Sequence, residues 1–227
     1  MGVLIALLII LTWGAHLFYL LVYLTVDPAS ITFWLHLLFQ TWLFTGLFIT
    51  AHDAMHNTVS RHRGMNNTIG FVATQLYAGL WYPQLLKQHR LHHQHPGTGD
   101  DPDYHVGNQN FFVWWFSFMK HYLTIGQIVI MAVLFNVGLL FFNELQLIVF
   151  WIVPAVLSTF QLFYFGTYRP HRLPHEDDMQ PHNARTQKRN HLWALLSCYF
   201  FGYHSEHHDS PKTPWWQLYK MKDSNLQ

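Results

Sequence analysis

Cysteine and charge are both scarce in this sequence. The chain of 227 residues contains one cysteine, Cys198, which excludes an internal disulfide and any metal or iron–sulfur site built on several cysteines. Charged residues make up 11% of the chain, against roughly 25% in typical globular proteins. The net charge of +1 provides no extended basic surface for a nucleic acid, so we expect no nucleic-acid partner.

Apolar and aromatic residues are abundant in place of charged ones. Apolar residues make up 51% of the chain, and it holds 19 Phe, 11 Tyr and 10 Trp. A water-soluble core of this size does not need so many aromatic side chains, whereas a lipid bilayer accommodates them. We therefore expect one all-α integral membrane domain over residues 1–227, in contact with the bilayer.

Four apolar runs have about the 20 residues that cross a bilayer. The first has neither a basic leading segment nor a small-residue cleavage site, so we interpret it as a membrane helix and not as a signal peptide. A fifth run, 68–82, has only about 15 residues and precedes Pro83, so we interpret it as re-entrant or interfacial. The four predicted spans, paired as two hairpins, are 3–26, 31–51, 122–142 and 145–168.

The distribution of basic residues orients these hairpins. Two hairpins leave residues 1–2, 52–121 and 169–227 on one face of the membrane, and all 13 Lys and Arg residues fall in those segments. The turns on the other face carry only the acidic residues Asp27 and Glu144. Because cytoplasmic loops are enriched in Lys and Arg, we expect the large polar face to be cytoplasmic.

Histidine is abundant, with 18 residues, and eight of them fall into three spaced clusters. One H-x-x-x-H and two H-x-x-H-H motifs follow predicted spans on the same face of the membrane. Residues at i, i+3 and i+4 share a helix face, so each cluster is expected to point its imidazoles at one spot. One metal rarely takes more than six ligands, so eight nitrogens indicate two metals in a His-rich cytoplasmic cap. The predicted ligands are His52 and His56 (region 52–56), His89, His92 and His93 (region 89–93), and His204, His207 and His208 (region 204–208).

The remaining histidines and the nearby acids have alternative interpretations. We expect His62, His121 and His191 to be ordinary surface groups, while His16 and His36, inside spans, are either packed or functional. Ligating histidines usually donate their second N–H to a carboxylate. Acids near the clusters are candidates for this role, although a solvated loop explains each of them equally well; they are Asp53, Glu206 and Asp209, with Asp100, Asp101 and Asp103 further away. Of these last three we favour Asp103.

The three histidine motifs resemble those of the membrane-bound di-iron fatty-acid desaturase and hydroxylase superfamily. Finer strings between about residues 40 and 220 look like the bacterial-type β-carotene ketolases, which make echinenone and canthaxanthin. Those strings are "FITAHDAMHNTV", "HRLHHQHPGTGDDPDYH", "PHR", "HNAR" and "FGYHSEHHDSPKTPWW".

The resemblance implies a chemistry and a location. It implies two iron ions and O2, and two hydroxylations at C4 of a β-ionone ring followed by loss of water to give a ketone. It also implies β-carotene or a related carotenoid as substrate, in a bacterial inner or thylakoid membrane. A ninth ligand is implied between the second and third motifs; we favour His171, with His182 as its rival and His95 and His105 behind them.

Substrate and electron-donor contacts are less specific in the sequence. Aromatic candidates for a polyene tunnel are Phe48, Tyr77, Trp81, Phe116 and Phe163, each of which has lipid-facing or core packing as its plainer interpretation. The chain has no dinucleotide-binding glycine loop and no iron–sulfur ligands, so we expect a ferredoxin-type donor. A basic docking surface is offered by Arg61, Arg63, Arg185, Lys188 and Arg189, unless these residues serve only topology or anionic lipid.

Other functions fit less well. A carotenoid 3-hydroxylase and an acyl-lipid desaturase use the same motifs and remain the alternatives among enzymes. A zinc hydrolase normally has three protein ligands and a carboxylate base. A bis-histidine haem needs facing histidines deep within spans, where only His16 and His36 lie. A metal transporter places ligands along its path, whereas these clusters lie at one end.

Overall fold

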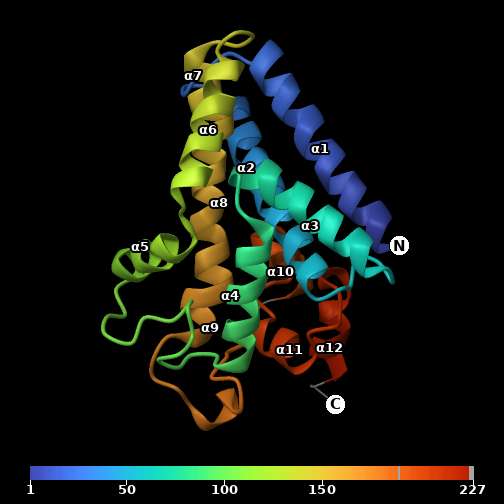
Figure 1. Cartoon of the computed structure of the whole chain (residues 1–227), viewed down its shortest axis with the longest axis vertical. Helices are drawn as coiled ribbons and strands as arrows, with labels where there is room; N and C mark the ends of the chain where they lie inside the picture. The colour runs from blue at the N-terminus through green and yellow to red at the C-terminus, as the bar shows by residue number, and fades with distance from the viewer. Residues whose placement is uncertain (189, 225–227) are drawn as a thin grey trace.

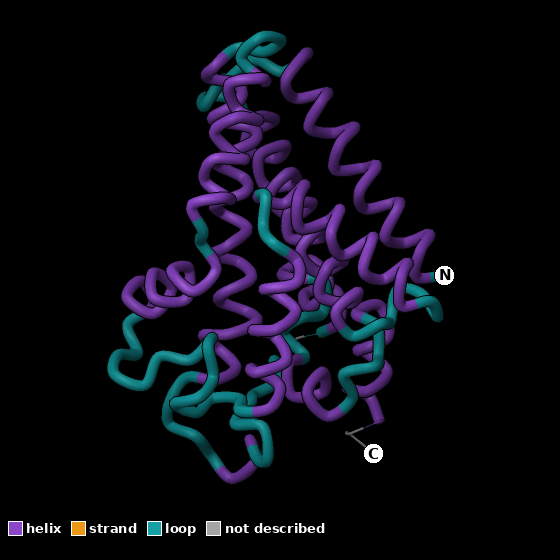
Figure 2. Tube along the Cα trace, in the orientation of Figure 1, coloured by secondary structure: helices purple, strands orange, loops and turns teal. Residues whose placement is uncertain are grey.

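The computed structural model describes residues 1–188 and 190–224, and every regular element within them is a helix (Figures 1 and 2). Most elements are α-helical, η1 and η2 are π-helical, and η3 and η4 are short 3₁₀ turns. In chain order they are α1 (Gly2–Tyr23), α2 (Ile31–Met55), α3 (Arg63–Ala78), α4 (Tyr82–Gln94), α5 (Phe111–Tyr122), α6 (Ile125–Gly138), α7 (Glu144–Leu147), η1 (Ile148–Ile152), α8 (Val153–Phe163), η2 (Tyr164–Tyr168), α9 (Arg169–His171), η3 (Asp177–Met179), α10 (His191–Cys198), α11 (His204–Asp209), η4 (Trp215–Gln217) and α12 (Leu218–Ser224).

Three helices are long and apolar enough to cross a membrane. They are Gly2–Tyr23, Ile31–Met55 and the continuous helix Glu144–His171, which runs from α7 to α9. They coincide with the first, second and fourth apolar runs of the sequence. The expectation of an all-helical protein with candidate membrane spans is therefore confirmed over the described residues, which provide a fourth candidate only if α5 and α6 are counted together.

The predicted span 122–142 is wrong in its bounds. The chain bends by 90° between α5 and α6. Helix α6 starts only after this bend, at Ile125, and has 14 residues. Leu123 and Thr124 have extended backbones, and the Thr124 hydroxyl accepts a hydrogen bond from the backbone N–H of Gln127 at 3.1 Å. Thr124 is therefore the N-cap of α6, and its extended backbone prevents α5 from continuing into α6. As a result α5 projects sideways from the bundle instead of extending α6 (Figure 1).

The short run around 68–82 forms α3, which has 16 residues and is not among the three helices long enough to span. It packs along α2 and ends at Gly79, whose φ of +66° places it in the left-handed region. Helix α4 then begins, with Pro83 in its first turn. The return is tight, because a Cβ on Gly70 would lie 2.2 Å from the ring of Tyr82.

One end of the bundle collects all the histidine-bearing segments. The C-terminal end of α2 meets α4, α9 and α11 at the lower end of Figure 1, while the turns after α1 and α6 lie at the opposite end. Between the two ends, a buried apolar cluster that includes Leu43, Phe44 and Leu47 packs against Ile9 and Trp13 of α1. This core fixes α2, and α2 runs four residues beyond the predicted span, through Met55.

Candidate metal centre

Helix α2 carries the first histidine motif to the end of the bundle. His52 lies in its last turn and His56 is the residue at its C-terminal cap. Since the helix is unbroken between them, the two side chains stand one turn apart on one face, with ring centroids separated by 4.9 Å.

Each H-x-x-H-H triplet divides between two groups of imidazoles. His89 and His93 of α4 belong to one group and His92 to the other. Successive residues of an α-helix are about 100° apart, so i+3 and i+4 lie on the same face as i but on opposite sides of it. In both triplets the i position groups with i+4. In α11, likewise, His204 and His208 fall together and His207 separates from them. The expectation that each triplet aims at one spot was therefore wrong, because each triplet spans two spots.

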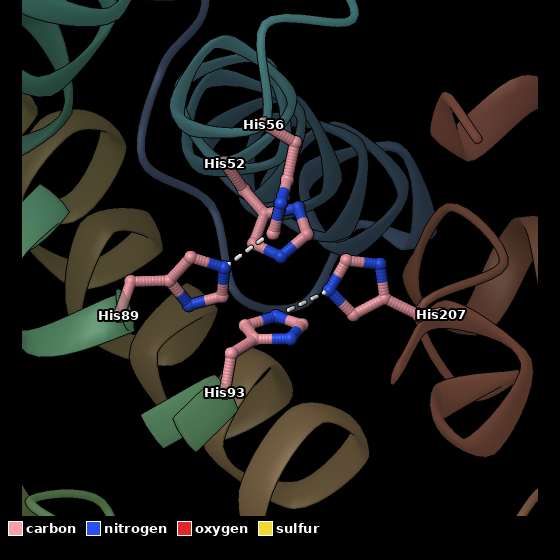
Figure 3. A group of neighbouring side chains, drawn as sticks. All are labelled: His52, His56, His89, His93 and His207. Atoms are coloured by element: carbon pink, nitrogen blue, oxygen red, sulfur yellow. Dashed lines mark hydrogen bonds between the residues drawn. The ribbon is translucent and has the colours of Figure 1, made fainter. Parts of the chain in front are cut away.

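The first imidazole group combines three helices. Figure 3 shows its five rings pointing toward one another, two from α2, two from α4 and one from α11. One nitrogen of each ring lies within 4.8 Å of the corresponding nitrogens of the others. The closest pairs are His56 Nε2 to His89 Nε2, at 2.6 Å, and His93 Nε2 to His207 Nε2, at 3.0 Å. The members are His52, His56, His89, His93 and His207.

The second imidazole group adds a residue from outside the motifs. His171, at the end of α9, stands 5.0 Å from His92 and 4.9 Å from His204 between ring centroids. His204 Nε2 and His208 Nε2 lie 3.0 Å apart. All four members, His92, His171, His204 and His208, are buried and meet the same 4.8 Å limit. The two groups adjoin, since the rings of His93 and His208 are 4.3 Å apart.

Several imidazole nitrogens in these groups are buried and have no hydrogen-bond partner among the described residues. They include both nitrogens of His52, Nε2 of His171 and Nδ1 of His208. A buried polar atom left unpaired is costly, so such a concentration calls for another partner. Two nitrogens bound at about 2.1 Å to one metal ion and at a right angle to each other would lie roughly 3 Å apart. The nitrogen pairs seen here have that spacing, so both groups fit a metal ion.

The electrostatics keep most of these histidines neutral; His92 is the exception, since burial lowers its pKa but the Asp101 carboxylate raises it more strongly. Burial, reinforced by the neighbouring imidazoles, lowers the pKa of His89, His204, His207 and His208 well below its usual value. The same causes lower the pKa of His56 to about 4 and that of His93 to about 2. Neutral imidazole is the form that binds a metal, so the neutral histidines are held in the ligating state.

Comparison with known proteins agrees with this geometry. A family model described as "Fatty acid desaturase" matches residues 28–136 and 122–226, which together cover most of the chain. The chain belongs to the fatty acid desaturase family. No solved structure matches it.

Within the desaturase family, relatives at about 40% identity are named as carotenoid ketolases. A β-carotene ketolase of Paracoccus sp. (strain PC1) is 42% identical over 181 residues, covering 78% of this chain and 74% of the relative. A β-carotene 4-ketolase of Protosiphon botryoides is 38% identical over 240 residues, covering 96% and 62%. A zeaxanthin 4-ketolase of Chlamydomonas reinhardtii is 43% identical over 185 residues, covering 79% and 42%.

One carboxylate of this desaturase-family chain contacts a grouped histidine directly. Both oxygens of Asp101 lie 3.0 Å from Nδ1 of His92, and the backbone N–H groups of Gly97 and Asp103 donate to the same carboxylate. The Asp103 side chain is further away, at 3.9 Å from His92, and accepts a hydrogen bond from the Tyr122 hydroxyl. Asp101 therefore contacts the ring where the sequence analysis favoured Asp103, because the local turn decides which carboxylate reaches His92.

The other predicted acids have different partners. Asp53 lies 3.9 Å from Nδ1 of His52 and accepts a hydrogen bond from the backbone N–H of Trp215. Asp209 pairs with His182 at 3.1 Å, and Glu206 pairs with Lys222 at 3.5 Å. These acids tie the C-terminal segments together, and none accepts a hydrogen bond from a ring of either group. Asp100 is exposed.

The rival ninth histidines lie outside both groups. His182 stacks over His208 with 5.4 Å between ring centroids, while its Nε2 faces Asp209. His105 accepts the backbone N–H of Asn108, and the exposed His95 caps the C-terminus of α4. Of the histidines expected at the surface, His62 and His121 are exposed and His191 binds Asp223 at 3.0 Å.

An apolar cavity of about 100 Å³ opens onto both groups. His52 and His89 of the first group line it, and so do His92 and His204 of the second. Of the aromatic candidates, Phe48 and Tyr77 line the cavity. The rest do not: Trp81 and Phe116 are exposed, and Phe163 is buried among the rings of Phe111, Trp114 and Phe118.

Sequence reasoning did not single out several lining residues. Tyr122 and Met119 come from the α5–α6 corner. No periodicity in the sequence predicts this bend. Leu162, Gly166 and Thr167 come from the long helix that ends at His171. For Thr167 a signal exists, since it stands four residues before the ligand candidate His171 on an apolar helix and so shares its face.

Proposed function

We propose that this chain is an O2-dependent di-iron ketolase that converts the C4 methylene groups of the β-ionone rings of β-carotene to ketones. The observation that carries the proposal is the pair of adjoining imidazole groups, with buried unpartnered nitrogens, at the end of an apolar cavity. The identity of 38–43% to three carotenoid ketolases supports the same substrate class.

In this proposal each imidazole group holds one iron. His52, His56, His89, His93 and His207 would hold the first, and His92, His171, His204 and His208 the second. Zinc also binds imidazole but has no redox chemistry. The bound irons would supply, with O2, the oxidising power that an unactivated C–H bond requires. Asp101 orients His92 through its Nδ1–H.

The overall conversion balances as two oxygenations and one dehydration. Each oxygenation consumes one O2, two electrons and two protons, places one hydroxyl on C4 and releases one water. The gem-diol formed by the second oxygenation then loses water to leave the C=O. The chain's own residues exclude bulk water from the ring, position C4 and hold most of the histidines neutral.

The electrons come from a separate redox protein, for which we propose a ferredoxin-type donor. Arg61, Arg63 and Lys188 are exposed and available to an acidic partner. Arg185 is half-buried and donates to the carbonyls of Arg172 and Pro174, so its main role is to hold that loop. Arg189 lies outside the described residues.

We also propose one membrane domain with the imidazole groups at the cytoplasmic rim. The three long helices then cross the bilayer, α5 and α6 together make the fourth, broken passage, and α3 stays at the interface. The cavity lies between the helices, where a substrate dissolved in the bilayer can enter without passing through water. This arrangement matches a carotenoid better than a soluble substrate.

The test is expression of the chain in cells that accumulate β-carotene and supply a reductant. The expected products are echinenone and canthaxanthin, whose conjugated ketones shift absorbance to the red, with about two irons per purified chain. A carotenoid 3-hydroxylase would instead give 3-hydroxylated rings without that shift, and an acyl-lipid desaturase would leave the pigment unchanged and alter fatty acids. Active protein containing zinc and no iron would overturn the mechanism.

A further inference from the structure

Apart from the histidines, one polar side chain of the cavity lining makes no hydrogen bond at all with a described residue. Besides histidines, its polar lining residues are Tyr77, Asp103, Tyr122, Gln127, Thr159 and Thr167. Tyr77 bonds to Ser158, Tyr122 to Asp103, and Thr159 to Trp115. Gln127 donates through Nε2 to the carbonyl of Ala78, while its Oε1 is buried and has no partner among the described residues. The Thr167 hydroxyl makes no hydrogen bond with any described residue, although only 5% of the residue's surface is exposed.

The backbone at Thr167 is shaped to bring it there. Residues Tyr164–Tyr168 form a π-helical turn, a feature that is rare and often found at functional sites. Beside it, Gly166 packs against Phe201 so closely that a Cβ would lie 2.1 Å from the ring. His171 follows Thr167 by four residues on the same continuous helix, so the hydroxyl lies about one turn from the second imidazole group.

The proposed reaction forms an alcohol intermediate that a hydroxyl in the cavity can bind. β-Carotene enters without polar atoms, but the first oxygenation places a hydroxyl on C4 inside a largely apolar cavity. A buried hydroxyl without a partner costs free energy, which would favour release of the alcohol before the second oxygenation. A threonine hydroxyl can both donate and accept, and its β-branched side chain is restricted to few orientations.

We propose that Thr167 hydrogen-bonds the C4 oxygen of the alcohol intermediate and so retains the ring for the second oxygenation. The inference rests on the proposed function and deepens it: Thr167 is a positioning residue that decides whether the product is an alcohol or a ketone. Asp103 and Tyr122 do not offer the same contact, because they already satisfy each other.

The test is the ratio of 4-hydroxy to 4-keto carotenoids made from β-carotene. Thr167→Val keeps the shape and removes the hydroxyl, and the loss of one hydrogen bond predicts a rise in that ratio of roughly 2- to 10-fold. Thr167→Ser should restore the ketone. Thr41→Val is the matched control, because Thr41 is a buried helical threonine outside the cavity whose hydroxyl already donates to Leu37 O at 2.9 Å.

The outcomes separate the two proposals. If wild-type protein forms no oxygenated carotenoid, the proposed function itself fails. If wild type makes ketone and Thr167→Val lowers total product at an unchanged ratio, the hydroxyl is merely structural and the inference is overturned. Should the valine variant not accumulate, Thr167→Ala carries the same prediction, and so does the relative rate at which wild type and Thr167→Ser oxidise a supplied 4-hydroxy carotenoid.

Discussion

Two histidine clusters in this protein look alike in composition and differ in what their nitrogens do. In the middle of the α1–α2 hairpin, His16 places Nδ1 2.5 Å from Gln40 Oε1 and Nε2 2.9 Å from His36 Nδ1. Both nitrogens of His16 are thereby used. At the end of the bundle, both nitrogens of His52 and Nε2 of His171 are buried and unpartnered.

The difference shows what distinguishes a metal site from a packed polar cluster. His16 and His36 lock two helices together, and neither belongs to the groups of three or more ligand atoms found among the described residues. The grouped histidines contribute nitrogens that converge and have no competing partner. Convergence with spare lone pairs, and not the number of histidines, indicates the metal.

The largest effect should follow from removing a histidine of the first imidazole group. His207 is the sole contribution of α11 to that group, so His207→Ala opens one side of it. We expect ketone yield to fall by more than about 100-fold, beyond the 10- to 100-fold typical of residues that only support ligands. Pigment analysis and iron content measure this, with His121→Ala as an exposed control. Full ketone yield from His207→Ala would remove the site assignment.

His171, in the second group, and His182, outside both groups, provide the next test. His171 has a free buried Nε2, whereas the Nε2 of His182 faces Asp209. We therefore expect His171→Ala to lose iron and ketone nearly as severely as His207→Ala, and His182→Ala to keep most of both. Iron content and ketone yield per chain, measured for both variants, test which histidine is the ninth ligand. The reverse order would make His182 the ninth ligand.

A smaller effect is expected from replacing Asp101, the carboxylate in contact with Nδ1 of His92. Asp101→Asn removes the charge that accepts from Nδ1 of His92, and loss of such a support typically costs 10- to 100-fold in metal affinity or activity. The measurement is the chelator concentration at which half of the iron is lost. Asp209→Asn is the matched control, since Asp209 adjoins His208 in the chain but pairs with His182. Equal losses from both variants would contradict the specific role of Asp101.

The eight motif histidines were found from spacing because helical periodicity is local, and His171 was favoured for its position after a predicted span. The same periodicity separates i+3 from i+4 by about 100°, but the division of each triplet between two groups depends on the positions of the neighbouring helices. The rest depends on tertiary contacts. The 90° corner comes from a cap at Thr124 inside a continuous apolar run. The cavity joins residues of α2, α3, α4, α5, α6, α8, η2 and α11, which are far apart in the chain.

The smallest functional effect should come from the α1–α2 cluster. His16→Ala leaves Gln40 without its partner, and hydrogen bonds between membrane helices are worth roughly 0.6–1.7 kcal/mol. We therefore expect a lower unfolding temperature in detergent, with iron content and ketone yield per folded chain unchanged. His36→Ala should behave similarly, since it breaks the other bond of His16. If either variant folded but lost iron or ketone yield, the α1–α2 cluster would be coupled to the proposed metal centre. A histidine whose two nitrogens are both hydrogen-bonded could then no longer be assigned a purely structural role in this protein.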